Sequence, residues 1–394
     1  MSTASRTPDA PAQRPGLAFA GVFAATFSCM LAVGTVLPVL PRYVHGPLDG
    51  GNVAVGVVIG AYAVTGLLLR PVAGRIADRR GRRPALLGGA LIVAASGFLY
   101  LLPLGVVGLI VARLALGAGE GTVFTAGSAW IVDLAPPQRR GRVIGLYGLA
   151  VWAGLSLGPL IGELLLNASG YTLVWVFAGL SPLAGAAIAL RLPDVFQPVA
   201  HTEEHPLIAR EALRPGSALA LASVGYATVA AFVVLHLEAR DVGHGAAVFG
   251  AFATMVVLTR LVGGDLPDRI GPARVATAAA LGEAVGLATI GVAHSLSVAL
   301  VGALAMGCAF SLLYPSLSLI VVGQVPETRR GAALGTFTAC FDAGIGLGAP
   351  LAGLAAALID YEGAFFLAAA IAVAAAATIA LTISTRGRAL LATR

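Results

Sequence analysis

The sequence predicts an all-α membrane protein with twelve transmembrane helices, arranged as two pseudo-symmetric bundles of six. Three observations lead to this prediction. First, 58% of the 394 residues are apolar and only 11% are charged, whereas soluble proteins carry about 25% charged residues. Second, windows of about 19 residues identify twelve apolar runs, each near the roughly 20 residues that cross a bilayer as a helix. Third, one charged motif occurs twice, 190 residues apart.

The apolar runs define the elements in chain order, and helix-interrupting residues separate them. Pro38 and Pro41 lie at the end of the first run, Pro103 to Gly105 separate the third from the fourth, and Asn167 to Tyr171 separate the fifth from the sixth. Proline and polar turn residues break apolar helices in this way. The spans are expected near residues 17–40, 53–72, 84–103, 106–132, 143–165, 172–191, 216–237, 246–263, 274–294, 296–322, 332–357 and 364–384.

These spans divide the chain into a tail at 1–16, a bundle at 17–191, a linker at 192–215, a second bundle at 216–384 and a tail at 385–394. The linker is the longest polar segment inside the chain. The first tail contains no short apolar segment with a cleavage site, so no secretory signal is expected. The loops between spans are too short to form an enzyme domain, and no enzymatic activity is expected.

The duplicated motif relates the two halves. Its first copy reads RPVAGRIADRRGRR at 70–83, and its second reads RLVGGDLPDRIGPAR at 260–274. The same offset aligns Arg139-Arg140-Gly141 with Arg329-Arg330-Gly331 and Gly158 with Gly348. A constant offset over this distance indicates two related units of roughly 190 residues. Secondary transporters are commonly built from such repeats, with the substrate site where the repeats meet.

Charge placement predicts the orientation of the chain. Every basic residue is an arginine, and all arginines except Arg42, Arg113 and Arg240 fall on one side of the predicted spans. By the positive-inside rule that side is cytoplasmic, so both termini are expected in the cytoplasm. The net charge of +6 is therefore topological, and no nucleic-acid partner is expected. The lysine-free composition is typical of a bacterial protein, which predicts the bacterial cytoplasmic membrane.

The motif after the second span resembles the signature loop of the major facilitator superfamily. Its residues are Gly74, Asp78, Arg79, Gly81 and Arg82, and the second copy retains Gly264, Asp268, Arg269 and Gly271. The resemblance implies twelve helices that alternate between outward-open and inward-open states. It also implies that this gating loop, together with Asp133, latches the halves in the outward-open state. The alternative is a basic loop that only sets topology.

The fifth predicted span resembles the antiporter motif of the drug/proton exporters within that superfamily. Its residues are Gly145, Gly154, Gly158, Pro159 and Gly162. Glycines four residues apart allow close helix contact, and proline removes a backbone hydrogen bond and kinks the helix. We expect this joint to rock at the interface of the halves. Glu163 departs from the family pattern, which ends in a second glycine.

Ionisable residues inside the spans are the candidates for substrate binding and proton coupling. A charge in a span costs about 2.5 to 3.5 kcal/mol on insertion, so a partner is expected. The surroundings of Arg113 resemble a family motif implicated in proton coupling, and Glu163 is its expected partner. Glu120 is then the titrating acid, alternating between protonated and ionised forms. The further candidates are Asp342 and, at the wall of the substrate cavity, Tyr314; Glu283 is expected to support packing.

The sequence therefore predicts a proton-driven exporter of a small amphipathic or apolar compound, such as a drug or secondary metabolite. Its expected partners are that compound, protons and the lipid bilayer, and it is expected to be a monomer. A proton-coupled uptake system for a polar nutrient and a non-transporting receptor or scaffold are the alternatives. No P-loop, metal-ligand spacing or cofactor motif is present in the sequence, so ATP drive, a metal and a cofactor are not expected.

Overall fold

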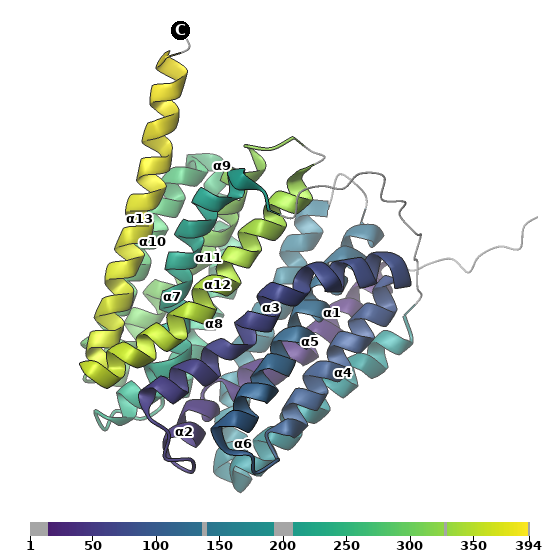
Figure 1. Ribbon diagram of the computed structural model, residues 1–394, viewed down its shortest axis with the longest axis vertical. Helices are drawn as coiled ribbons and strands as arrows, with labels where there is room; N and C mark the ends of the chain where they lie inside the picture. The colour runs from purple at the N-terminus through teal and green to yellow at the C-terminus, as the bar shows by residue number, and fades with distance from the viewer. Residues whose placement is uncertain (1–14, 136–139, 193–207, 327–328, 393–394) are drawn as a thin grey trace, which may run out of the picture.

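A computed structural model describes residues 15–135, 140–192, 208–326 and 329–392, and these residues form helices and turns without a strand. The all-α prediction is confirmed. Figure 1 shows the helices packed side by side in two groups, α1 to α6 and α7 to α13. The helices are α1 (Pro15–Val36), α2 (Val39–His45), α3 (Asn52–Arg80), α4 (Arg82–Leu99), α5 (Gly105–Leu134), α6 (Arg140–Leu190), α7 (Arg210–Glu238), α8 (Gly245–Gly263), α9 (Leu266–Ile270), α10 (Pro272–Gly291), α11 (Leu296–Val322), α12 (Arg330–Leu358) and α13 (Tyr361–Ala392).

Ten helices among the described residues are long and apolar enough to cross a membrane. One of them, α6, has non-helical backbone angles at Ser169 and Gly170, where the sequence predicts two spans. The 18-residue α4 is not among the ten, although it occupies the third predicted span. The membrane-spanning architecture is thus confirmed, while the count of twelve stays a prediction.

Several predicted boundaries are wrong because charged residues continue the helices. The motif at 70–83 is expected to be a loop, but α3 continues to Arg80 and α4 begins at Arg82. Only Gly81 makes the turn, with φ at 104°, and its counterpart Gly271 has φ at 103°. Glycine is favoured at this φ because it lacks a Cβ. Similarly, α7 begins at Arg210, inside the predicted linker, and α13 continues to Ala392, inside the predicted tail at 385–394. Most of the linker and of the tail at 1–16 lies outside the described residues.

The two halves repeat each other at the level of contacts. Gly117 of α5 packs against the backbone of Tyr62 in α3, and Gly307 of α11 packs in the same way against Phe252 in α8. These pairs are related by the 190-residue offset, so the duplication predicted from the sequence extends to helix packing. Helices in membranes approach closely where small residues face each other.

The halves meet mainly through α3 with α12 and α6 with α8. Gly56 of α3 lies against the backbone of Ala349 in α12, and the Asn52 amide donates to the Ala356 carbonyl at 3.0 Å. The hydroxyls of Ser156 in α6 and Thr254 in α8 share a hydrogen bond. These contacts lie toward the end of the molecule that carries α2, here called the α2 end. The opposite end carries the Gly81 and Gly271 turns and is called the arginine-rich end (Figure 1).

The close approach at Gly117 generates a stability prediction. A Cβ at this position would overlap the Tyr62 carbonyl oxygen, which cannot move without shifting α3. Gly117→Ala is therefore expected to destabilise the protein by about 1 to 3 kcal/mol, the usual cost of overpacking. Gly88→Ala in α4, where nothing lies within 4 Å of the added Cβ, is the matched control. The measurement is the fraction of detergent-solubilised protein that remains monodisperse after heating to a series of temperatures. Equal midpoint temperatures for the two variants would contradict the prediction.

Candidate functional site

A buried ion cluster joins the two halves in the middle of the bundle. Arg70 of α3 donates to both carboxylate oxygens of Asp342 in α12, from Nε at 2.7 Å and from Nη2 at 3.1 Å. Its Nη2 also lies 3.7 Å from Oε2 of Glu120 in α5. We call these three residues the Arg70 cluster. A bidentate guanidinium-carboxylate pair combines charge with fixed geometry, so this contact ties α3 of one half to α12 of the other.

Burial within the Arg70 cluster differs between its members. The Asp342 side chain is 2% exposed, whereas those of Arg70 and Glu120 are 17% and 14% exposed. The Arg70 guanidinium also lies over the Phe124 ring at 5.4 Å, an attractive cation-π arrangement. Two carboxyl groups thus share one cation, and the more exposed one belongs to the half that also supplies the arginine.

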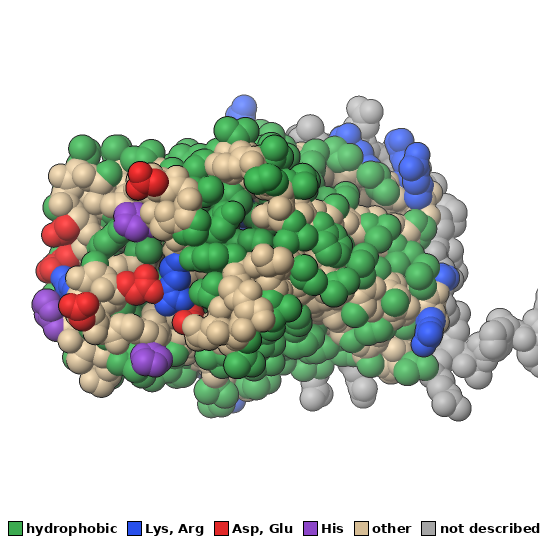
Figure 2. All heavy atoms as spheres, turned by 90° about the horizontal axis from the view of Figure 1, so that it is seen from below, with side chains coloured by type: hydrophobic (Ala, Val, Ile, Leu, Met, Phe, Trp, Pro, Cys, Tyr) green, Lys and Arg blue, Asp and Glu red, His purple; other side chains and the backbone are tan. Residues whose placement is uncertain are grey.

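A second ion cluster joins the halves at the α2 end. Arg42 of α2 pairs with Glu163 of α6 at 2.5 Å and also with Glu238, the last residue of α7. We call these residues the Arg42 cluster. The view in Figure 2 looks onto the α2 end, where acidic and histidine side chains gather on one part of the face. The Arg42 cluster holds the two halves together at this surface.

The predicted pairing of Arg113 with Glu163 is wrong, because Glu163 binds Arg42. The Arg113 side chain is fully buried. It donates to the carbonyls of Val58 and Ile59 in α3, at 3.2 and 2.8 Å, and lies 4.6 Å from the Tyr62 ring centroid. Arg113 therefore connects α5 to α3 within the first half and stands apart from the Arg70 cluster.

The signature motif forms its own polar cluster at the arginine-rich end. Arg82 pairs with Asp78, one turn earlier in sequence, and donates to Asp133 of α5 at 2.9 Å. Arg79 is exposed on the last turn of α3, and Gly74 lies inside that helix. The predicted association of the motif with Asp133 is thus present, within the first half.

The second copy of the signature motif, which retains fewer of the motif residues, makes different contacts from the first. Gly264 follows α8, and Arg269 of α9 pairs with Asp265 while remaining 73% exposed. Asp268 lies in the first turn of α9, before the Gly271 turn.

The antiporter-like glycines do not face the other half, which corrects the prediction of a joint there. Gly154 packs on Met30 of α1, and Gly158 and Gly162 pack on Gly34 and Thr35. Pro159 lies within this stretch of α6, and Gly145 lies near the start of the helix. Close α1–α6 packing presents the opposite face of α6, with Trp152 and Ser156, to α8. The motif thus packs α6 on α1, and this packing orients the opposite face of α6, which contacts α8.

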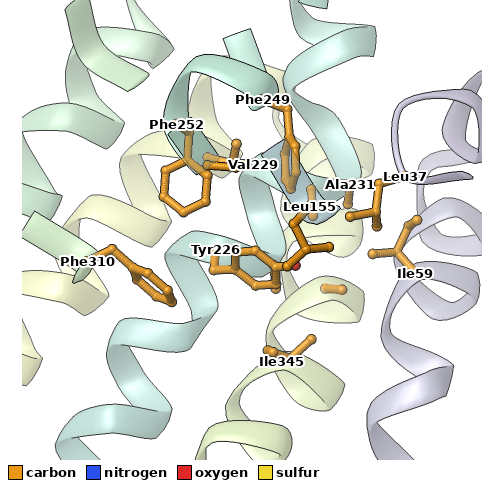
Figure 3. Close-up of a cluster of buried hydrophobic side chains, with 14 of the residues drawn as sticks. Leu37, Ile59, Leu155, Tyr226, Val229, Ala231, Phe249, Phe252, Phe310 and Ile345 are labelled. Atoms are coloured by element: carbon orange, nitrogen blue, oxygen red, sulfur yellow. The ribbon is translucent and has the colours of Figure 1, made fainter. Parts of the chain in front are cut away.

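Aromatic rings from both halves meet beside the Arg70 cluster. Trp152 of α6 lies with its ring 5.7 Å from Phe310, 6.1 Å from Tyr226 and 6.1 Å from Phe252. Phe341 of α12 lies 6.3 Å from Phe310. These five residues are called the aromatic layer, and Figure 3 shows Tyr226, Phe252 and Phe310 converging with Leu37, Ile59 and Leu155 from the first half. The layer is largely buried and apolar.

The other candidate residues take different places. Tyr314 of α11 shares a hydrogen bond of 2.9 Å with Thr338 of α12 and packs on Phe337, at the same level as the Arg70 cluster. Glu283 of α10 is fully buried, and neither of its carboxyl oxygens has a hydrogen-bond partner among the described residues. This burial is consistent with the expected packing role of Glu283.

Sequence reasoning misses Arg70 and Arg42. In the sequence Arg70 reads as the first residue of a loop motif, whereas it lies inside α3. A signal that marks it is present, since Arg70 and Arg260 occupy the same repeat position and both extend an apolar run. Arg42 stands out in the sequence only as an exception to the charge bias. An arginine on the side that otherwise lacks them, near Glu163 and Glu238 at span ends, is the signal that could have found it.

Comparisons with known proteins agree with this geometry. Residues 22–266 and 216–391 match the sequence model described as Major Facilitator Superfamily. A protein of Salmonella typhimurium named as an uncharacterized MFS-type transporter is 34% identical, covering 92% of this chain and 95% of its own. A Burkholderia mallei protein with the same kind of name is also 34% identical, over 93% and 91%.

Solved structures share the fold at low identity. The human organic anion transporter MFSD10 has a TM-score of 0.72 at 18% identity and covers 93% of this chain and 99% of its own. The nucleoside transporter NupG has a TM-score of 0.78 at 14% identity, with coverages of 92% and 99%. At these identities the likeness concerns the fold alone.

The Arg42 cluster generates a conformational prediction. Arg42→Gln removes the ion pair with Glu238 that joins the halves at the α2 end, together with the pair to Glu163 that orients Arg42 within the first half, so separation of the halves there is expected to become easier. Loss of about 1 kcal/mol would raise the separated fraction roughly fivefold relative to the closed one. Double electron-electron resonance measures the distance distribution between spin labels at His45 and Asp360 in a cysteine-free background. The separated state is expected to appear as an additional population at longer distance.

A matched control breaks an ion pair that stays within one half. Arg240 binds Glu362 and the carbonyls of Gly291 and Ala293, all in the second half. Arg240→Gln should therefore leave the distance distribution between His45 and Asp360 unchanged. A longer distance of equal weight in both variants would show that general loosening, and not the Arg42 cluster, governs this end.

Proposed function

Because the chain belongs to the major facilitator superfamily, we propose that it is a proton-coupled exporter of a small amphipathic or apolar molecule, working by alternating access. The protein is a multi-pass membrane transporter of that family. The proposal adds the coupling ion, the direction and the substrate class. It also adds the bacterial cytoplasmic membrane, with both termini in the cytoplasm, which the arginine bias supports.

Two sets of contacts between the halves support alternating access. The Arg42 cluster and the α3–α12 packing at Gly56 close the α2 end, which the arginine bias assigns to the outside. The Arg70 cluster lies further toward the cytoplasmic end. Both sets join repeat-related units that are themselves held by repeated backbone contacts such as Gly117 on Tyr62. Rocking of one half against the other then breaks contacts between the halves and leaves the packing within each half in place.

The single observation that carries proton coupling is the sharing of Arg70 by Asp342 and Glu120. Charged residues are retained inside membrane spans at a cost, and proton relays are a common reason. A proton on Asp342 removes the charge that holds α12 to Arg70, and Arg70 then keeps Glu120 as its partner within the first half. Protonation would in this way loosen the contact between the halves. Glu120 alternates between the protonated and ionised forms as the other carboxyl of the coupled pair.

Two features support export over uptake. The glycine and proline pattern of α6 resembles the antiporter motif, and its glycines pack α6 tightly on α1. The aromatic layer supplies an apolar surface that suits an apolar or amphipathic compound. A proton-coupled uptake system for a polar nutrient is the second candidate, favoured by the charged residues of the Arg70 cluster.

The proposal predicts coupled flux in vesicles. In proteoliposomes with an imposed pH difference, a panel of lipophilic cations, neutral aromatics and aromatic carboxylates should contain compounds that accumulate on the acidic side. Glu120→Gln and Asp342→Asn should each lower this accumulation at least about tenfold while leaving the protein folded and inserted, since each removes a proton-carrying group. The measurement is radiolabelled compound per vesicle against time.

The control is Glu283→Gln, which neutralises a fully buried carboxyl outside the Arg70 cluster and should preserve accumulation. Accumulation on the alkaline side would identify proton-coupled uptake. Absence of any coupled flux across the panel would contradict the transport proposal, and full activity of Glu120→Gln would remove that residue from it.

A further inference from the structure

Arg260 of α8 is a partly buried cation that the proposed coupling mechanism does not use. Its Nε is shielded from solvent without a hydrogen-bond partner, and it forms no ion pair among the residues that the structure describes. Its Nη1 would lie 3.0 Å from a Cβ at Gly148, so the guanidinium reaches α6 of the other half. A guanidinium inside a membrane span without a counter-charge is costly even when it is only partly buried, and the described residues offer Arg260 no carboxylate.

The internal repeat shows how the surroundings of Arg260 differ from those of Arg70. Arg260 is the counterpart of Arg70, which has two carboxylates. The offset places Phe310 where the first half has Glu120, and Trp152 where the second half has Asp342. At the two repeat positions that carry acids around Arg70, the repeat of Arg260 therefore has two residues of the aromatic layer. The second half thus retains the arginine of this repeat position, but aromatic residues occupy the two positions that carry carboxylates around Arg70.

Along the helix axes, the neighbours of Arg260 lie at a different height from the residues of the aromatic layer. Gly148 precedes Trp152 by four residues in α6, and Phe310 precedes Tyr314 by four residues in α11, which runs the opposite way. On both helices the aromatic residue is thus one turn, about 5.4 Å, closer to the α2 end than the neighbour of Arg260. The hydrogen bond of 2.9 Å that Tyr314 shares with Thr338 fixes the position of the Tyr314 ring.

We propose that Arg260 binds the carboxylate of an amphipathic organic anion whose apolar body packs on the aromatic layer. A carboxylate matches the guanidinium fork in charge and shape, and the one-turn separation fits a carboxyl group attached directly to an aromatic body. Arg70 does not compete for this anion, because Asp342 and Glu120 already neutralise it. This inference rests on the proposed function and narrows its substrate class from amphipathic compounds to organic carboxylates.

The test is equilibrium binding to the purified full-length protein in detergent, with no pH gradient. The probes are naphthalene-2-carboxylate, naphthalene-2-carboxamide and 2-naphthylmethylammonium, which share one apolar body and differ in charge. The wild type is expected to bind the carboxylate about tenfold more tightly than either other probe, the discrimination that a charge-assisted hydrogen bond provides. Arg260→Gln should reduce the preference to within about twofold, and Arg260→Lys should retain part of it.

The matched control is Arg214→Gln, which removes an exposed arginine of α7 and should keep the preference. The wild-type comparison of the three probes needs no variant, so the inference can be overturned even if Arg260→Gln folds poorly. Equal binding of the probes, binding of none at millimolar concentration, or an unchanged preference in a folded Arg260→Gln would overturn it. Because binding needs no gradient, absence of coupled flux in vesicles counts against the proposed function alone.

Discussion

The bidentate ion pair between Arg70 and Asp342 is the contact on which the coupling of the two halves depends. It is buried, joins α3 of the first half to α12 of the second, and leaves Glu120 within reach of the same guanidinium. Leaving a buried charge without a partner is costly, but when a proton neutralises Asp342, Glu120 remains as the counter-charge of Arg70. In the proposed mechanism a proton therefore changes how strongly the halves adhere, which is the property that a coupled transporter needs.

Packing of small residues holds the helices of each half together, which gives the Arg70–Asp342 ion pair between the halves a larger effect. Within each half, glycines bring helices into backbone contact, as at Gly117 on Tyr62 and Gly307 on Phe252. This packing supports the proposal that each half moves as a unit, with the ion pairs across the interface helping to set their relative position. The halves are related yet unequal, because the first retains the intact signature motif and Glu120, whereas the second contributes Asp342, Arg260 and most of the aromatic layer.

Much of the fold is predictable from the sequence, and less of the site. Hydropathy locates helices because each must cover the same hydrocarbon thickness, and the repeat reveals the two halves. Helix ends are misplaced where arginines continue an apolar helix, as at Arg80. Partners of buried charges are missed because depth along a helix does not reveal the direction of a side chain. Glu163 and Arg113 are matched in depth by the sequence, yet Glu163 reaches Arg42, and Arg113 turns to the Val58 and Ile59 carbonyls.

The most direct test of proton-controlled adhesion between the halves is the pH dependence of the distance between α3 and α12 at the arginine-rich end. Spin labels at Ile76 and Gly331, followed by double electron-electron resonance in nanodiscs, report it. Lowering the pH is expected to deplete the wild-type distance population seen at high pH, because protonated Asp342 no longer binds Arg70. In Asp342→Asn the distribution should be the same at every pH. An identical pH response in the wild type and in Asp342→Asn would contradict the claim.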